Sequence, residues 1–539
     1  MLSLELVREA PEQTTIANNS VDRRSRCDIY SRKQPCSQAC QLKLTVLAAL
    51  QTHSASHQLK DCDGSVPPQT ASSTTREPPY YQAPWMPGVT LSISATLLCL
   101  TDVGWNDTVN VSVWLPFEDW NGRLWALGGG GYSSSFGVLY LTQAVAKGYA
   151  AIATDSGHES GIETAMRLDL ALSSPGNANV ELIEDWAYKA LDSLAAIGKN
   201  TTESFYAQAP AYSYFSGCSG GGRQAMTIAQ RYPSDFDGIL AVAPAIDISS
   251  LIPAAYWPKQ VAKGLDYYPE SCEVETFTQA ALDACDGFDG IVDGIISQPL
   301  RCNFTAASVV GKQYSCNGTN STLPSQTAQI VQAASDGPTS FQHGISAPGI
   351  SLDANLSATY IVPANSSADS DLLSGWFEVL IAKNDSSFSL DALTDDDFFQ
   401  ALYQSRQEYF GSLDAHDPLL TSLRESGTKL LNWQGMADET IPVKINTRYY
   451  DQVLAVSPEG VQDYYRFFEA PGVGHCYGGE GALPAQAFDQ LRAWVENGTV
   501  PEVLYATKEN ETRTLCPYPG VQTLVGYGDY GEAKFDCRA

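Results

Sequence analysis

Positive charge is scarce in this sequence. The chain has 32 lysines and arginines against 61 aspartates and glutamates, which gives a formal net charge of −29 at pH 7. Such a surface repels phosphate backbones, so we expect no nucleic-acid partner. Long apolar runs are missing too, since the run LKLTVLAAL at residues 42–50 is far too short to cross a membrane. We therefore expect no membrane partner either.

Cysteine, by contrast, is plentiful for a protein of a reducing compartment. Among the 13 cysteines, Cys285 lies close to Cys302 and Cys516 close to Cys537, which favours disulfides. Residues 1–41 show no signal-peptide pattern. Cysteines and glycosylation sequons together nevertheless predict a secreted, extracellular glycoprotein, with sequons for example at Asn106, Asn110, Asn303, Asn317, Asn365 and Asn510.

Strand and helix patterns alternate in two parts of the chain. Helices are predicted over residues 182–198, after Ser219, after Pro442 and over residues 484–496. This alternation is typical of a mostly parallel sheet covered by helices. Strands are predicted in VNVSVWLP, GRLWALGG, YAAIATD, AYSYFSG, GILAVAPA, KLLNWQG and DYYRFFEA.

A break in this alternation predicts the domain organisation. Residues 86–247 and 411–539 are expected to form the two parts of one α/β core. Residues 248–410, rich in Ser, Asp, Asn and Pro, are expected to form an inserted lid domain. Residues 1–85 form an N-terminal segment whose structure the sequence does not predict. Ligands of such a fold bind at the carboxyl ends of the strands, beneath whatever covers them.

The stretch from Gly217 to Gly221 fits the pattern G-x-S-x-G and lies between a predicted strand and a predicted helix. Small neighbours allow the sharp turn that lifts the oxygen of Ser219 above the sheet. The helix that follows points its positive end at a developing oxyanion. The alternative is a glycine-rich turn with an incidental serine. The context favours an α/β-hydrolase fold with Ser219 as the nucleophile.

Histidine is rare as well, with six residues from which to choose a base. His475 follows the predicted strand DYYRFFEA, and Asp438 follows KLLNWQG, with Glu439 as the alternative acid. The order serine, acid, histidine is that of the α/β-hydrolase fold. We predict a triad in which His475 is the base for Ser219 and Asp438 orients the imidazole.

An oxyanion hole requires backbone N–H groups that point to where negative charge develops. One is expected from Gly220, the residue after the nucleophile. The other is expected from the run Gly128 to Gly131, with Gly129 and Gly130 as the candidates. The alternative is a flexible loop, but four consecutive glycines after a strand favour close approach of the backbone.

Cysteines flank two of the predicted catalytic residues. Cys218 directly precedes Ser219, and Cys476 directly follows His475. If the triad assembles, these cysteines are neighbours in space, and a disulfide between them would fix the position of the base. The alternative is a pair of unrelated buried thiols.

With these motifs the chain resembles the fungal tannase and feruloyl esterase family. The resemblance runs from about Cys99 to the C-terminus and includes GGGGY, SGCSGGGRQ, AQRYPSDFDGI, GMADETIP and PGVGHCYGG. It implies an α/β-hydrolase fold with a lid and cleavage of phenolic acid esters. It also implies a triad of Ser219, Asp438 and His475, with Cys218 bridged to Cys476.

An acidic, glycine-rich stretch lies between Cys285 and Cys302. Its three aspartates can converge on a hard cation, although their spacing is not that of an EF-hand, and a solvated acidic turn is the alternative. The resemblance implies a structural calcium ion (Ca2+) in the lid at this position. The implied ligands are the side chains of Asp286, Asp289 and Asp293 and the carbonyl groups of Ile291 and Ile295.

The expected function is hydrolysis of an ester between a phenolic acid and a sugar, polysaccharide or polyphenol through an acyl-enzyme. Galloyl and feruloyl esters are not distinguished by these motifs. A serine peptidase and a non-catalytic binding protein on a hydrolase scaffold remain as alternatives.

Overall fold

A computed structural model describes most of the chain. It covers strands at residues 57–60, 74–76, 81–82 and 90–91, and then residues 93–102, 105, 107–356, 370–509, 511–527 and 533–538. Most of the predicted N-terminal segment, residues 1–85, and the sequons at Asn106, Asn365 and Asn510 lie outside the described residues.

The core is one mixed β-sheet of ten strands, in the order β1-β5-β6-β8-β7-β11-β12-β17-β18, with β2 also paired to β5. The strands from β8 to β18 are parallel, whereas β1, β2, β5 and β6 pair in the antiparallel sense. The bounds are β1 (His57–Lys60), β2 (Thr74–Arg76), β5 (Ile93–Asp102), β6 (Val109–Pro116), β7 (Arg123–Leu127), β8 (Ala150–Thr154), β11 (Tyr212–Cys218), β12 (Gly238–Val242), β17 (Lys429–Gly435) and β18 (Tyr465–Ala470).

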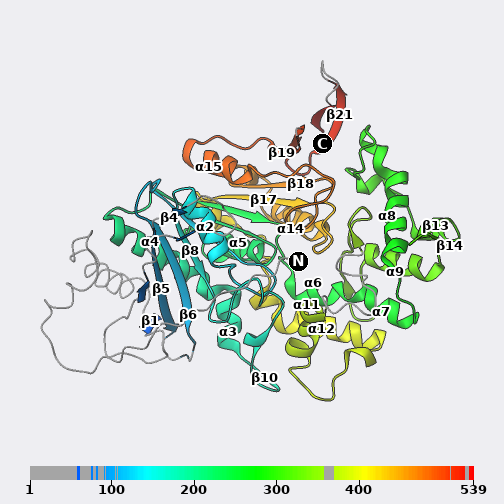
Figure 1. The fold of residues 1–539 in the computed structure, drawn as a ribbon, viewed down its shortest axis with the longest axis horizontal. Coiled ribbons are helices and arrows are strands. Elements are labelled where there is room, and N and C mark those ends of the chain that lie inside the picture. The colour runs from blue at the N-terminus through cyan, green and yellow to red at the C-terminus, as the bar shows by residue number, and fades with distance from the viewer. Residues whose placement is uncertain are drawn as a thin grey trace, which may run out of the picture.

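Helices cover both faces of this sheet (Figure 1). The helices α4 (Ala190–Tyr206), α5 (Gly220–Arg231) and α14 (Val443–Val456) pack into one apolar core. The helices α2 (Val138–Ala146) and α15 (Ala487–Asn497) pack on the opposite face. Every residue of β8 and β12 is buried, because strands covered on both faces have no solvent-facing side. The predicted α/β core is confirmed.

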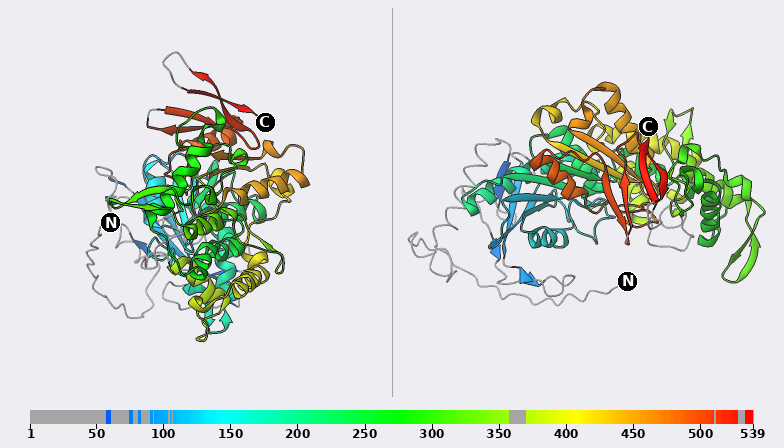
Figure 2. Two further views of the ribbon diagram at one scale, coloured as in Figure 1. Left: turned by 90° about the vertical axis from the view of Figure 1, so that its right-hand side faces the viewer. Right: turned by 90° about the horizontal axis from the view of Figure 1, so that it is seen from above.

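The segment between β12 and β17 is largely helical, which the sequence analysis did not predict. Figure 1 shows it in green to yellow beside the carboxyl ends of the parallel strands, and Figure 2 shows it from two further sides. We call residues 248–410 the lid. It packs around one apolar cluster of its own and around a second that it shares with core residues such as Tyr132 and Trp186. Its helices are α6 (Ile248–Ala255), α7 (Trp257–Gly264), α8 (Ser271–Cys285), α9 (Ser325–Asp336), α11 (Ser370–Gly375) and α12 (Asp395–Leu413).

The chain enters and leaves the lid at one place. Asp247 precedes α6, Asp414 follows α12, and the backbone N–H of Ala415 donates to the carbonyl of Ile246 at 2.8 Å. Two disulfides, Cys272–Cys316 and Cys285–Cys302, cross-link the lid. The lid is therefore joined to the core through two adjacent chain segments.

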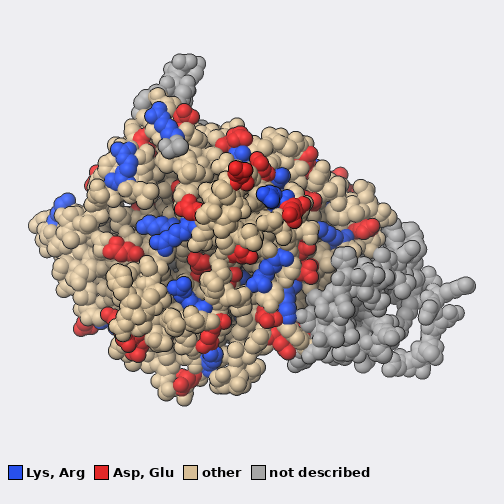
Figure 3. All heavy atoms as spheres, turned by 180° about the vertical axis from the view of Figure 1, so that it is seen from behind, with Lys and Arg blue, Asp and Glu red and all other residues tan. Residues whose placement is uncertain are grey.

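Two β-hairpins complete the C-terminal part and project from the core (Figure 2). They consist of β19 (Leu504–Lys508) with β20 (Glu511–Leu515) and β21 (Val521–Tyr527) with β22 (Ala533–Arg538), joined by the disulfide Cys516–Cys537. Among the described residues, no helix combines the length and apolar character needed to cross a membrane. On the described part of the face in Figure 3, acidic and basic side chains are interspersed rather than separated by sign.

Candidate active site

Ser219 lies at the sharp turn between β11 and α5. Its φ of 62° and ψ of −120° are values that residues other than glycine rarely adopt. A Cβ atom on Gly217 would lie 2.4 Å from the carbonyl oxygen of Gly221, and one on Gly220 would lie 2.5 Å from that of Gly131. Only glycine fits these positions, so the local sequence folds as a nucleophile elbow requires.

His475 and Asp438 lie in loops that follow the adjacent strands β18 and β17. The Nδ1 atom of His475 is 2.9 Å from the Oδ2 atom of Asp438. The Asp438 side chain is fully buried, whereas 18% of the His475 side chain is exposed. The imidazole is thus held by a buried carboxylate on one side and retains access to solvent, as a general base requires.

The carboxylate of Asp438 is surrounded by donors. Its Oδ1 atom accepts the backbone N–H groups of Thr440 and Ile441, each at 2.8 Å, and its Oδ2 atom accepts the side-chain amide of Gln434 at 2.7 Å. The carbonyl oxygen of Gln434 in turn accepts the amide of Asn446 at 2.8 Å. These bonds fix the direction in which Asp438 faces His475. Sequence analysis missed Gln434 and Asn446 because no local motif marks them.

The alternative acid, Glu439, has a different contact. Its carboxylate accepts the backbone N–H of His475 at 3.1 Å, so it holds the loop and not the imidazole. Burial alone lowers the pKa of His475, but attraction to Asp438, the hydrogen bond to Asp438 and the charge of Glu439 outweigh burial. The net result is a raised pKa of His475.

A disulfide joins Cys218 to Cys476, with their Cα atoms 6.0 Å apart. Because these cysteines adjoin Ser219 and His475 in the sequence, the disulfide holds the elbow next to the histidine loop. Cys476 itself has a φ of 64°, so the backbone is tightly turned on both sides of the bridge.

The glycine run after β7 packs against the elbow. The N–H groups of its two predicted oxyanion-hole donors, however, form hydrogen bonds within the protein. The N–H of Gly129 donates to the side chain of Gln224, and that of Gly130 to the carbonyl of Ser133, each at 3.1 Å. Gln224 takes the N–H group of Gly129 and the turn to Ser133 takes that of Gly130, so these contacts do not support the prediction of Gly129 and Gly130 as oxyanion-hole donors. Within the described part of the chain, the N–H groups of Gly131 and Gly220 make no hydrogen bond.

Comparison with known proteins agrees with this geometry. A family model described as tannase and feruloyl esterase matches residues 100–537. A probable feruloyl esterase of Arthroderma benhamiae is 35% identical over 532 residues, covering 92% of this chain and 97% of that protein. The chain belongs to the tannase and feruloyl esterase family. A tannase of Aspergillus oryzae is 28% identical, covering 86% of this chain and 88% of that protein.

Solved structures share the fold of this family member. A tannin acyl hydrolase from Aspergillus niger matches with a TM-score of 0.78 and 27% identity, covering 92% of this chain and 94% of that chain. Feruloyl esterase B from Aspergillus oryzae matches with a TM-score of 0.71 and 22% identity, covering 92% of this chain and 100% of that chain. The predicted α/β-hydrolase fold with a lid is confirmed. As a member of this family, the protein is a carboxylic ester hydrolase.

The lid of this esterase contains the predicted cluster of aspartates, which we call the acidic loop (residues 286–295). The carboxylate of Asp286 accepts the backbone N–H groups of Asp293 and Gly294 at 3.1 and 2.8 Å, which curls the loop around it. Asp289 accepts the N–H of Ile291 at 3.1 Å. Ile295, the other predicted carbonyl ligand, has a buried side chain. The disulfide Cys285–Cys302 closes this segment.

Two oxygens of the acidic loop are buried without a partner. Within the described residues, Oδ2 of Asp289 and Oδ1 of Asp293 accept no hydrogen bond. The other oxygen of Asp293 forms an ion pair with Arg513 of β20 at 2.5 Å. Unpaired buried carboxylate oxygens are costly, so the chemistry of this donor set fits a hard cation such as calcium.

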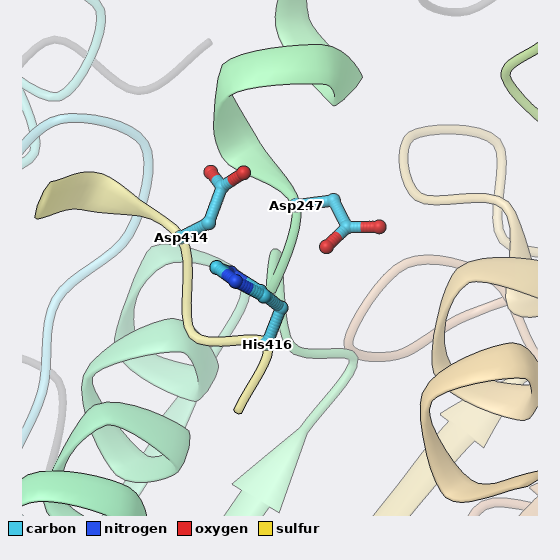
Figure 4. Close-up of side chains that lie close together, drawn as sticks. All are labelled: Asp247, Asp414 and His416. Atoms are coloured by element: carbon cyan, nitrogen blue, oxygen red, sulfur yellow. The ribbon is translucent and has the colours of Figure 1, made fainter. Parts of the chain in front are cut away.

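A second acidic group lies where the lid joins the core (Figure 4). Ligand atoms of Asp247, Asp414 and His416 lie within 4.8 Å of one another, a grouping that could hold a metal ion. Burial, followed by repulsion from Asp247, raises the pKa of Asp414 to about 8, and burial raises that of Asp247 to about 6. Both oxygens of Asp414 accept hydrogen bonds from Ser249. Sequence analysis missed this group, whose members come from segments far apart in the chain.

Proposed function

We propose that this chain hydrolyses phenolic acid esters, of the feruloyl or galloyl type, through a covalent acyl-enzyme on Ser219. The observation that carries the proposal is the hydrogen-bonded pair of His475 and Asp438, which a disulfide holds beside a serine in a strained elbow. Relatives that are named feruloyl esterase and tannase support the substrate class.

The reaction begins at the oxygen of Ser219. This oxygen attacks the ester carbonyl while the Nε2 atom of His475 takes the serine proton, and Asp438 stabilises the imidazolium that results. The N–H groups of Gly220 and Gly131 donate to the oxyanion of the tetrahedral intermediate. When the intermediate collapses, the alcohol departs with the proton from His475 and leaves the acyl group on Ser219. Water, deprotonated by His475, then attacks the acyl carbonyl, and the proton passes from His475 to the oxygen of Ser219 as the phenolic acid leaves.

The base must be neutral before it can accept the serine proton. Because the pKa of His475 is raised, the imidazole stays protonated to a higher pH than an ordinary histidine does. We expect kcat/KM to fall on the acid side of that pKa. Replacement of Glu439 by glutamine removes one of the charges that raise it, so it should move this acid limb to lower pH.

A cavity beside the histidine loop supports binding of a substrate between core and lid. It has a volume of about 610 Å³ and lies between α8 and the loops that carry Glu439 and Tyr477. Tyr477 is 73% exposed at this edge. An apolar ring available to solvent next to the base suits a phenolic ring or the sugar to which it is esterified.

We further propose that the acidic loop binds calcium, with a structural role. The side chains of Asp286, Asp289 and Asp293 and the carbonyls of Ile291 and Ile295 would hold it, and the two unpartnered oxygens support this assignment. The ion would supply positive charge that offsets repulsion between the carboxylates. The loop belongs to the lid and none of its residues is part of the triad.

Secretion is proposed from the disulfides, because such bonds persist in oxidising compartments. The four disulfides between described cysteines leave little reduced thiol in this part of the chain.

Initial rates on methyl ferulate and methyl gallate, with the Ser219→Ala variant as the blank, test the proposed function. Turnover of either ester that disappears in the variant supports it, and the faster ester identifies the acyl preference. If neither ester is turned over, the proposed substrate class is wrong and the peptidase and binding-protein alternatives return. Turnover that survives in the variant would contradict the serine mechanism.

A further inference from the structure

A second cavity opens at the junction of lid and core. Its volume is about 120 Å³, and its walls are α6, α12, α14 and the lid residues 333–350. Ser219, Asp438 and His475 do not line it. A cavity needs a volume of only about 10–15 Å³ to hold one water molecule, so this cavity is large enough for a small organic molecule.

Two arginines line the cavity. Arg406 comes from α12 in the lid, and Arg448 from α14 in the core. Neither makes a hydrogen bond or an ion pair with any residue that the structure describes. Arg448 is exposed and Arg406 is half-buried, so both guanidinium groups keep hydrogen-bond donors for a ligand in the cavity. Their free donors point to an anion.

Among the described residues that line the cavity, Asp247 is the one carboxylate, and it does not satisfy both arginines. Figure 4 shows its carboxylate turned away from that of Asp414. Burial raises the pKa of Asp247 to about 6, while attraction to Arg406 and Arg448 opposes this rise. Even with Asp247 ionised, two positive charges face one negative charge, so one positive charge remains for a ligand.

The remaining walls are mainly apolar. Leu251 and Ala254 of α6, Trp257 of α7, Leu402 of α12 and Ile445 of α14 line the cavity. Such walls suit the carbon body of a ligand and are a poor match for a fully hydrated inorganic anion. The site thus combines an apolar lining with two cationic side chains, one from the lid and one from the core.

We propose that this cavity binds a small monocarboxylate with an apolar body. The guanidinium groups of Arg406 and Arg448 take the carboxylate, since their planar donor pairs match its two oxygens. Leu251 and Trp257 contact the apolar body. The site is separate from the triad, and its existence does not depend on the proposed reaction.

Calorimetric titration with benzoate tests this site, and benzamide serves as its uncharged isostere. The titrations use the full-length Ser219→Ala protein, so a failure of the proposed esterase reaction would not affect them. We expect benzoate to bind at least about tenfold more tightly than benzamide. We also expect Arg406→Gln and Arg448→Gln each to weaken benzoate binding by about tenfold or more.

Arg424→Gln is the matched control, because Arg424 is an exposed arginine of α13 (Thr421–Ser426) that does not line the cavity. This control should bind benzoate normally. Arg448 is itself exposed, so its replacement is expected to leave the fold intact, which a thermal melt checks. In chains that retain Ser219, both cavity variants should keep the initial rate of methyl ferulate hydrolysis. Absent benzoate binding, equal affinity for benzamide, or unchanged affinity in both cavity variants would each overturn the proposal.

Discussion

Two loops of this esterase contain buried aspartate oxygens, and the loops differ in whether the protein supplies hydrogen bonds to these oxygens. In the loop after β17, Asp438 accepts three hydrogen bonds from its own surroundings and contacts His475. In the acidic loop, Asp289 and Asp293 each keep a buried oxygen that accepts no hydrogen bond from described residues. The carboxylate of Asp438 is satisfied by the protein, whereas one oxygen each of Asp289 and Asp293 has no partner among the described residues.

This difference matches the two roles that we propose, a catalytic one for Asp438 and a cation-binding one for the acidic loop. A buried carboxylate with fixed donors can hold and polarise an imidazole without further help. Buried carboxylate oxygens without partners are costly, and a hard cation removes that cost. We therefore expect changes at Asp438 to reduce the rate, and changes at the acidic loop to reduce stability.

The largest expected effect is that of Asp438→Asn. The amide cannot stabilise the imidazolium, so we expect kcat to fall by about 10³- to 10⁴-fold while the fold is retained. Steady-state kinetics on methyl ferulate measures the loss. The control is Glu439→Gln, which alters the neighbouring carboxylate and should reduce kcat by less than about tenfold. A larger loss in Glu439→Gln than in Asp438→Asn would reverse the assignment of the acid.

The second prediction compares how much two disulfides contribute to the free energy of unfolding. The Cys218–Cys476 bridge closes a separation of 258 residues and Cys285–Cys302 one of 17. Loop-closure entropy predicts that they stabilise the fold by about 5.5 and about 3 kcal/mol. Replacement of both cysteines of each pair by serine, followed by denaturant unfolding, checks the order.

Only loss of the first bridge should also lower kcat, because only that bridge adjoins Ser219 and His475. Equal kinetic losses in the two double variants would show that the bridge beside the triad has no special role in placing the base.

Calcium should stabilise the fold without taking part in the chemistry. At about 100 times its Kd, a ligand specific for the native state adds about 2.7 kcal/mol to the free energy of unfolding. A chelator should therefore lower Tm, and added calcium should restore it. Asp289→Asn should abolish this response, while Asp283→Asn, an exposed neighbour on α8, should retain it. A calcium response that persists in Asp289→Asn would place the ion elsewhere.

The smallest expected effect is on the pH dependence of stability, and it comes from Asp414. A buried carboxyl group can also avoid the cost of an unpaired charge by keeping its proton. Burial and repulsion from Asp247 raise the pKa of Asp414 to about 8, against about 3.9 for an unfolded chain. Between these values the folded state binds more protons than the unfolded state, so this group makes stability fall as pH rises. Asp414→Asn should make the decline of Tm between about pH 5 and pH 8 shallower. A steeper decline in the variant would contradict the raised pKa.

Sequence predicts the catalytic end of the sheet well, because the information there is local. The glycines around Ser219 are dictated by close backbone contacts, and His475 and Asp438 each follow a strongly apolar strand. The positions were therefore predictable from pattern and order, although their catalytic roles stay predictions. The choice of Gly131 as the proposed second oxyanion donor was not predictable, since it depends on which N–H group of the glycine run remains without a hydrogen bond.

The lid was harder to predict for a physical reason. Its helices bury some apolar residues within the lid and others against distant core residues such as Tyr132 and Trp186, so none has the long amphipathic pattern of α4. The start of α12 was equally hard to predict. Its capping box of Thr394 and Asp397 lies within an acidic run, and such a run is also typical of a solvated loop. The cavity with Arg406 and Arg448 depends on contacts between distant segments, which no local motif records.

The central claim is that Ser219 carries the acyl group. Its most direct test is a rapid acid quench during turnover of a feruloyl ester, followed by mass spectrometry of the digested protein. We expect one feruloyl group on the peptide that contains Ser219 and none in the Ser219→Ala variant. Steady turnover without an acyl group on that peptide would contradict it.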